Sequence, residues 1–155
     1  MPTTKYFEDF EVGEIFRSPS KTLTDAHFLF FAGMTGDNHS IHYDDEYAKA
    51  TRFGKRVTHG LLVTSMGALG ASELSPLVEE SMVAFLEQSS RFLKPVLIGD
   101  TIQPELEVSE LIPKTKVGVL RLKTRITNQH DEVVLEGTHA YLIKKRPQTD
   151  RASRP

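Results

Sequence analysis

The sequence predicts an α+β fold, with helices in the first half of the chain and antiparallel strands in the second half. Before Pro76 the pattern indicates three helical segments, the third of them rich in glycine. After Pro76 come runs rich in β-branched and aromatic residues, at 82–92, 101–111, 116–128 and 132–144. Within 116–128 apolar and basic residues alternate, which indicates a sheet with one face on the core and one in water.

The N-terminal part is expected to lead irregularly into the first helix. Residues 6–16 mix aromatic and acidic side chains around Gly13 and predict one short strand. Thr24 supplies an N-cap and Asp25 an acidic first turn for a helix that continues through 27–34. Because this helix is apolar on nearly every side, we expect it to be buried or covered by a partner.

The stretch 35–65 contains the candidate site. Asp37 and His42 are five positions apart, a spacing that points two side chains about 140° apart on a helix and to opposite faces of a strand. They can converge only if the chain between them turns, and Asn38 and Ser40 are residues that favour turns. The sequence therefore predicts a loop that aims a carboxylate and an imidazole at one point.

Two short segments follow this loop. Acidic residues at 44–46 predict the capped start of a second helix, which ends near Ala50. Residues 51–57 then form a basic loop that includes Arg56. A solvated turn is the preferred interpretation of this loop, and contact with a substrate phosphate is the alternative.

The third helix is predicted over about 58–73 and contains Gly60, Gly67 and Gly70. Glycine costs roughly 1 kcal/mol at each interior helix position, so its repeated use needs a reason. Close approach of the sheet is a sufficient one. We therefore expect this helix to be central. Residues 128–131 predict the turn of a hairpin between the last two strands.

Composition limits the function classes. The 155 residues fit one domain, expected to span 1–145, with 146–155 as a disordered tail that has almost no apolar content. A net charge of −2 gives no electrostatic basis for binding nucleic acid or an anionic membrane. Without cysteine, disulfides, thiolate nucleophiles and cysteine-ligated metals are excluded. The N-terminus lacks signal-peptide features and no apolar run approaches the ~18 residues of a membrane span, so we expect a soluble cytoplasmic protein.

Several motifs together resemble one enzyme family. They are GDNHSIHYDDEYA at 36–48, Phe53-Gly54, HGLL at 59–62, FLKPV at 92–96 and Gly99-Asp100. This set is similar to the MaoC-like (R)-specific enoyl-CoA hydratases, and the resemblance covers about 7–144. The resemblance implies a hot-dog fold, in which a curled antiparallel sheet wraps a central helix. It also implies a homodimer with the active site near the subunit interface.

The resemblance also assigns roles to residues. Asp37 and His42 match the family's catalytic pair, and Gly60 matches the glycine whose N–H polarises the thioester carbonyl. The family usually has Asn-Pro where this chain has His39-Ser40, so the turn loses a rigid proline and gains an imidazole. For His39 a supporting role in the loop is preferred. His39, Ser65 and Arg56 are retained as candidates for substrate binding.

Three chemical parts are needed to hydrate a trans-2-enoyl thioester, and the sequence contains all three. Asp37 and His42 can hold and deprotonate one water by general acid–base catalysis, worth roughly 10²–10⁴-fold. Gly60, at the predicted start of the third helix, can present a backbone N–H to the enolate oxygen. Taken singly, an aspartate in a turn and a histidine beside Ile41 are more often structural. The combination with Gly60 favours (R)-specific hydration of enoyl-CoA and the reverse dehydration.

Two alternatives stay open. One is a hot-dog thioesterase, which would aim a carboxylate at water and would not need the Asp37–His42 pair. The other is a non-catalytic subunit that binds acyl thioesters, against which the intact pair argues.

No cofactor is expected, because the CoA or acyl-carrier-protein thioester is the substrate. A metal bound by Asp37, His39 and His42 is conceivable, but the chemistry needs none and no fourth ligand is evident. His59 is expected to support the loop by hydrogen bonding.

Overall fold

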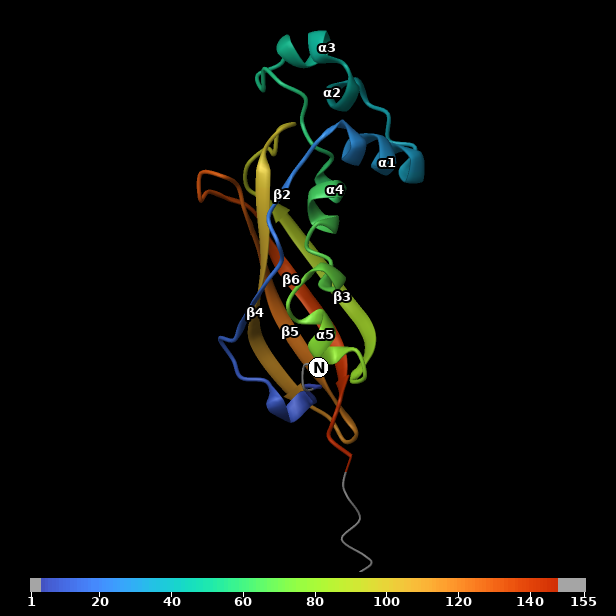
Figure 1. Cartoon of the computed structure of the whole chain (residues 1–155), viewed down its shortest axis with the longest axis vertical. Helices are drawn as coiled ribbons and strands as arrows, with labels where there is room; N and C mark the ends of the chain where they lie inside the picture. The colour runs from blue at the N-terminus through green and yellow to red at the C-terminus, as the bar shows by residue number, and fades with distance from the viewer. Residues whose placement is uncertain (1–3, 148–155) are drawn as a thin grey trace, which may run out of the picture.

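The computed structural model describes residues 4–147 and is built on a curled antiparallel sheet (Figure 1). Its four long strands are β3 (Met82–Phe92), β4 (Thr101–Pro113), β5 (Val117–Thr127) and β6 (Val133–Lys144). Two short strands, β1 (Ile15–Arg17) and β2 (Lys21–Thr22), pair with β4. The order β1-β4-β5-β6-β3 leaves β3 at one edge. The α+β class and the four predicted strands are confirmed.

The alternation predicted for β5 sets the two faces of the sheet. Leu120, Leu122 and Ile126 are fully buried on the face that carries the helices. Lys123 and Arg125 lie on the opposite face, where Glu107 and Glu105 are their register partners on β4. Charged pairs on one face and aliphatic side chains on the other fix the register, because a slip of one residue would exchange them.

The core between helices and sheet has two parts. One part joins the 3₁₀ helix Phe7–Asp9 and α5 (Ser75–Val78) to the sheet, through residues such as Leu74 and Leu120. The other lies beneath α1 (Asp25–Thr35) and α4 (Gly60–Ser65). In it Phe28, Leu62 and Ile126 pack together, and this second part supports the candidate site.

Three helices gather at one end of the sheet, at the top of Figure 1. They are α1, α2 (Ser40–Tyr43) and α3 (Asp45–Lys49). As expected from its sequence, α3 is capped by Asp44, whose carboxylate accepts the backbone N–H groups of Glu46 and Tyr47 at 2.9 Å. The predicted first and second helices are therefore confirmed.

The long central helix expected over 58–73 is wrong in its length. The chain forms α4, a turn, a 3₁₀ helix at Leu69–Ala71 and then α5. Gly67 packs against the sheet so closely that a Cβ there would lie 3.3 Å from Cγ2 of Thr124. Close approach is thus the reason for Gly67, as predicted. The helix ends in this glycine-rich segment because glycine is a poor interior helix residue.

The apolar surface of α1 is only partly covered. Phe28 and Phe31 are buried, whereas Leu29, Phe30 and Met34 are 64%, 76% and 78% exposed. The expectation that this helix is buried therefore holds for one of its faces within the single chain.

The first residue of the predicted C-terminal tail makes a contact with the N-terminal segment. The Arg146 guanidinium contacts the Asp9 carboxylate at 2.6 and 2.7 Å. Residues 148–155, the rest of that predicted tail, lie outside the described part of the chain.

Within residues 4–147, no helix combines the length and the apolar character needed to cross a bilayer.

Candidate active site

His42 presents one free ring nitrogen. It lies on α2, and its Nδ1 is 2.6 Å from the carbonyl oxygen of Val57. A carbonyl oxygen can only accept, so Nδ1 carries the proton and Nε2 keeps a lone pair. The N–H of Val57 donates in turn to the carbonyl of Ile41 at 3.1 Å, which holds the two segments together. The orientation of the His42 ring is therefore set through Nδ1, which leaves Nε2 as its unprotonated nitrogen.

Asp37 reaches the same place through a glycine turn. Gly36 ends α1 with φ of 75°, in the left-handed region that favours glycine, and its N–H donates to the Ala32 carbonyl at 2.7 Å. The exposed Asp37 carboxylate accepts the backbone N–H of His39 at 3.4 Å. A carboxylate oxygen of Asp37 and one ring nitrogen each of His42 and His59 lie within 4.8 Å of one another. The predicted convergence of Asp37 and His42 is confirmed.

His59 is the third member of this cluster. Its Nε2 is 3.1 Å from the carbonyl oxygen of Asp37, so the expected hydrogen bond to the loop is confirmed. Its ring also stacks on that of His42, with centroids 3.8 Å apart and planes 22° apart, which the sequence did not predict. The available signal was the position of His59 directly before Gly60. Desolvation lowers the pKa of His59, so its neutral form is favoured.

The cluster of Asp37, His42 and His59 does not fit a metal ion. An imidazole binds a metal in its ring plane, at about 2.0–2.1 Å for zinc. Two nearly parallel rings 3.8 Å apart cannot both direct in-plane lone pairs at one ion. His42 Nδ1 is also engaged by Val57, and His59 Nε2 by Asp37. This cluster differs from the set considered from the sequence, which was Asp37, His39 and His42, because it contains His59 in place of His39.

Gly60 and His42 line one pocket of about 430 Å³. Gly60 is the first residue of α4, and its N–H has no hydrogen-bond partner within residues 4–147. A Cβ at position 60 would lie 3.1 Å from the Phe92 ring, so the glycine makes room for Phe92 at this wall. Most of the remaining lining is apolar, from Phe53, Val57, Val63, Leu93, Pro95, Val96 and Val134. The pocket thus joins a base, a free backbone donor and an apolar cavity.

His39 takes the supporting position preferred from the sequence. Its Nδ1 accepts the N–H of Ile41 at 3.2 Å and caps α2. Its own backbone N–H holds the Asp37 carboxylate. His39 does not line the pocket shared by His42 and Gly60.

Ser65 and Arg56 lie elsewhere. The hydroxyl of Ser65 donates to the Leu62 carbonyl at 2.7 Å, and the residue lines a separate cavity beside Met66 and Ile102. Arg56 is not solvated, since its side chain is only 12% exposed and contacts Asp25 at 2.6 Å and Asp45 at 2.8 Å. The interpretation of Arg56 as a solvated turn residue is therefore corrected to a link between α1 and α3, and its contact with a substrate phosphate stays a prediction.

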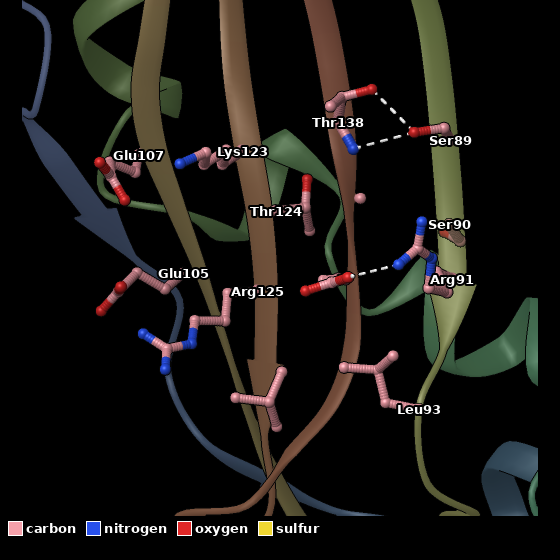
Figure 2. A pocket seen from close by; sticks show the side chains of 13 residues that line it. Ser89, Ser90, Arg91, Leu93, Glu105, Glu107, Lys123, Thr124, Arg125 and Thr138 are labelled. Atoms are coloured by element: carbon pink, nitrogen blue, oxygen red, sulfur yellow. Dashed lines mark hydrogen bonds and ion pairs between the residues drawn. The ribbon is translucent and has the colours of Figure 1, made fainter.

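A larger depression of about 750 Å³ lies on the charged outer face of the sheet and contains none of the predicted site residues. Figure 2 shows polar and charged side chains across this face, with dashed contacts between Ser89 and Thr138 and at Arg91. Ser89 and Thr138 are joined at 2.8 Å, and Arg91 contacts Glu136 at 3.4 Å. Basic Lys123 and Arg125 alternate there with acidic Glu105 and Glu107. This surface has the features of a solvated sheet face.

Comparison with known proteins agrees with the geometry of the pocket. A model described as the MaoC-like domain matches residues 9–132, which include Asp37, His42, Gly60 and most of the sheet. The chain belongs to the MaoC-like domain family.

Two curated relatives of this MaoC-like protein match over most of both chains. The 3-hydroxybutyryl-CoA dehydratase of Methylorubrum extorquens is 33% identical over 147 residues, covering 94% of this chain and 88% of the relative. An (R)-specific enoyl-CoA hydratase of Rhodospirillum rubrum is 31% identical over 141 residues, covering 91% and 93%. The relatives' names thus support hydratase or dehydratase chemistry for the family.

Solved structures confirm the fold. A protein from Archaeoglobus described as a monoamine oxidase regulatory protein has a TM-score of 0.86 and 37% identity, covering 94% of this chain and 97% of its own. A Mycobacterium tuberculosis protein described as a double hot-dog fold has a TM-score of 0.80 at 22% identity, covering 96% of this chain and 47% of its own. The MaoC-like chain therefore has the hot-dog fold predicted for it.

Proposed function

We propose that this protein catalyses the (R)-specific hydration of trans-2-enoyl-CoA to (R)-3-hydroxyacyl-CoA, and the reverse dehydration. The observation that carries the proposal is one pocket lined by both His42, whose Nδ1 is engaged by Val57, and Gly60, whose N–H has no partner within residues 4–147. The relatives named as hydratase and dehydratase support the same chemistry.

The base and the carboxylate are arranged to bind one water. His42 is held through Nδ1, so its Nε2 can accept a proton from water. The Asp37 carboxylate lies within 4.8 Å of a His42 ring nitrogen and can accept the second hydrogen of the same water. In the reaction this water supplies both the hydroxyl group and the proton that are added across the double bond. Its hydroxyl forms the bond to Cβ, and a proton is delivered to Cα as the double bond is lost.

The thioester carbonyl must gain and then lose negative charge during this addition. Gly60 presents an unpaired backbone N–H on the same pocket, where it can donate to the enolate oxygen. α4 has only six residues, so we assign this role to the local amide rather than to a long helix dipole.

The pocket also suits the rest of an acyl thioester. Its apolar walls, including Val63 and Val134, can bury an acyl chain. Arg52 and Lys94 line the same pocket, and a cation there can contact the phosphates of the carrier. We propose acyl-CoA as the carrier form, with acyl carrier protein as the form to be compared. The proposed chemistry requires no cofactor, and the cytoplasmic location stays a prediction.

We further propose a homodimer. β3 is an edge strand, and its Val83, Phe85 and Leu86 are 50%, 56% and 51% exposed. α1 adds the exposed Leu29, Phe30 and Met34. An edge strand with apolar side chains is a surface that a second copy can cover.

A panel of trans-2-enoyl-CoA substrates of increasing length tests the proposed function. Loss of the enoyl absorbance, formation of the (R)-3-hydroxyacyl thioester and no release of free thiol are the expected results. Release of thiol with the double bond intact would instead identify a thioesterase. Binding of enoyl-CoA without any turnover would identify a non-catalytic acyl-thioester-binding subunit.

A further inference from the structure

His59 contacts both members of the catalytic pair, although the proposed reaction gives it no step. It lies directly before α4 and is 2% exposed. The ring of His59 contacts Asp37 in the loop and His42 on α2. Because His59 is itself the residue before α4, it joins the loop, α2 and α4.

One edge of the ring holds the main chain of Asp37. Its Nε2 is 3.1 Å from the Asp37 carbonyl oxygen and 2.9 Å from the Tyr43 hydroxyl. The Tyr43 hydroxyl lies 2.9 Å from the carbonyl of Phe28, to which it donates. Because carbonyl oxygens only accept, Nε2 of His59 carries the proton and donates. This hydrogen bond fixes the backbone from which the Asp37 carboxylate projects.

The face of the ring holds His42. The two imidazoles stack at 3.8 Å between centroids, so the plane of His42 cannot tilt toward His59. The other surroundings of His59 are the rings of Phe28 at 5.6 Å, Phe31 at 4.7 Å and Tyr43 at 5.6 Å. His42 is thus located by two independent contacts, the Val57 carbonyl at Nδ1 and the stack on its face.

The environment of His59 favours a neutral ring. Its Nδ1 is buried without a hydrogen-bond partner in the described part of the chain. A proton there would place an unpaired charge in a buried site. The titratable groups that face the ring are Asp37 from the loop and His42 and Tyr43 from α2, while α1 contributes the apolar Phe28 and Phe31. Burial is the largest influence and lowers the pKa of His59.

We propose that His59 is a positioning residue of the Asp37–His42 pair and that it acts as a permanently neutral imidazole. Its N–H fixes the main chain of Asp37, and its face fixes the ring plane of His42. When His42 takes the proton of water, the positive ring forms against a neutral face, whereas a protonated His59 would repel it. The proposal rests on the proposed hydration for its kinetic part only.

Two substitutions separate the contacts. His59→Gln keeps an N–H donor for the Asp37 carbonyl but removes the stack, and His59→Phe keeps a ring against His42 but removes the donor. Each is expected to lower kcat by about 10–100-fold with KM nearly unchanged, because small displacements of catalytic groups cost that much. In a His42→Ala background neither change lowers kcat further, since His59 acts through that pair. Losses that multiply in the double variants would overturn the positioning role.

A matched control is His139→Gln. His139 is also a buried histidine, 3% exposed and bonded to a tyrosine hydroxyl (Tyr141, 3.0 Å), but it lies outside the pocket. If His139→Gln lowers the melting temperature as much as the His59 variants while kcat is retained, loss of stability does not explain the effect at His59. An equal loss of kcat in the control would overturn the proposal.

Nitrogen NMR of the wild-type protein tests the same claim when a variant does not fold or when no hydratase activity is found. The expected result is that His59 stays in the Nε2–H form and does not titrate between pH 5 and pH 8, with His42 in the Nδ1–H form. Titration of His59 near its ordinary value, about 6.5, would contradict the proposal whatever the outcome of the substrate assay.

Discussion

At the scale of single residues, the site depends on which atoms are already engaged. Nδ1 of His42 is bonded to Val57, so the proton-accepting atom is chosen by a main-chain carbonyl rather than by a carboxylate. The carboxylate of Asp37 is left to interact with water. Asp37 and His42 converge through a turn of a few residues, and for this reason their convergence could be predicted from the sequence.

The hydrogen bond of His59 to the loop was predicted, but the stack of its ring on His42 was not. His59 is separated from Asp37 by 22 positions, and the packing of α1 onto α4 brings its ring to the loop. Ser65 is close to Gly60 in sequence, but its hydroxyl bonds back to Leu62 and the residue lines a separate cavity.

Gly60 allows a test of the proposed carbonyl-binding donor. Gly60→Ala adds a Cβ that the Phe92 ring must move to accept, but it keeps the N–H. Gly60→Pro adds a comparable bulk and removes the N–H. Proline suits the first residue of a helix, and the ψ of 132° at His59 is compatible with a following proline. We expect the proline variant to have a kcat about 10²–10³-fold below that of the alanine variant. Equal kcat in two folded variants would show that another group polarises the carbonyl.

The buried His139 predicts a pH dependence of stability. Burial lowers its pKa in the folded state, whereas the unfolded chain binds a proton near pH 6.5. Below that pH the unfolded state gains protons first, so stability falls as the pH decreases, by up to about 1.4 kcal/mol per pH unit for one histidine. Urea unfolding of His139→Gln between pH 7 and pH 5 is expected to show a shallower loss of stability than the wild type. An identical slope would mean that His139 is protonated in the folded state as well.

At the scale of elements, local patterns predicted the strands better than the helices. The alternation in β5 is decided by neighbours two residues apart, and the structure keeps it from Leu120 to the end of the strand. The third helix failed because its glycines respond to the sheet, a long-range contact. The expected turn at residues 128–131 is present as the connection between β5 and β6, with Asp131 at φ of 58°.

The ion pairs of Arg56 connect two helices and were not predicted from the sequence. Its guanidinium joins Asp25 of α1 to Asp45 of α3, which are 31 and 11 positions from Arg56 in the sequence. Both carboxylates are exposed to solvent. Lysine cannot reproduce this forked contact. We expect Arg56→Lys to lower the free energy of unfolding by about 1 kcal/mol without a change in KM.

Lys55→Arg, in the same loop and exposed, is the control for this change and is expected to leave stability unaltered. If Arg56→Lys instead raised KM with unchanged stability, the residue would bind substrate, as the sequence alone had allowed.

At the scale of the whole molecule, the apolar surface is concentrated on β3 and α1. We expect light scattering to give twice the chain mass of 17.4 kDa for the wild type. Leu86→Lys places a charge on the exposed edge strand and is expected to shift the protein toward the monomer.

Val12→Lys serves as the matched change. Val12 is 65% exposed but lies in the N-terminal segment, away from β3, so this variant is expected to remain dimeric. A monomeric wild type, or equal dissociation of both variants, would contradict the proposed interface.

The central claim is that Asp37 and His42 act together on one water, and a double-mutant cycle in kcat for enoyl-CoA hydration tests it most directly. Asp37→Asn removes the negative charge at nearly constant size, and His42→Ala removes the base. We expect each change to lower kcat by about 10²–10⁴-fold with KM nearly unchanged, and the double variant to be little slower than either single one. Losses that simply multiply, or a His42→Ala enzyme with normal kcat, would contradict the account.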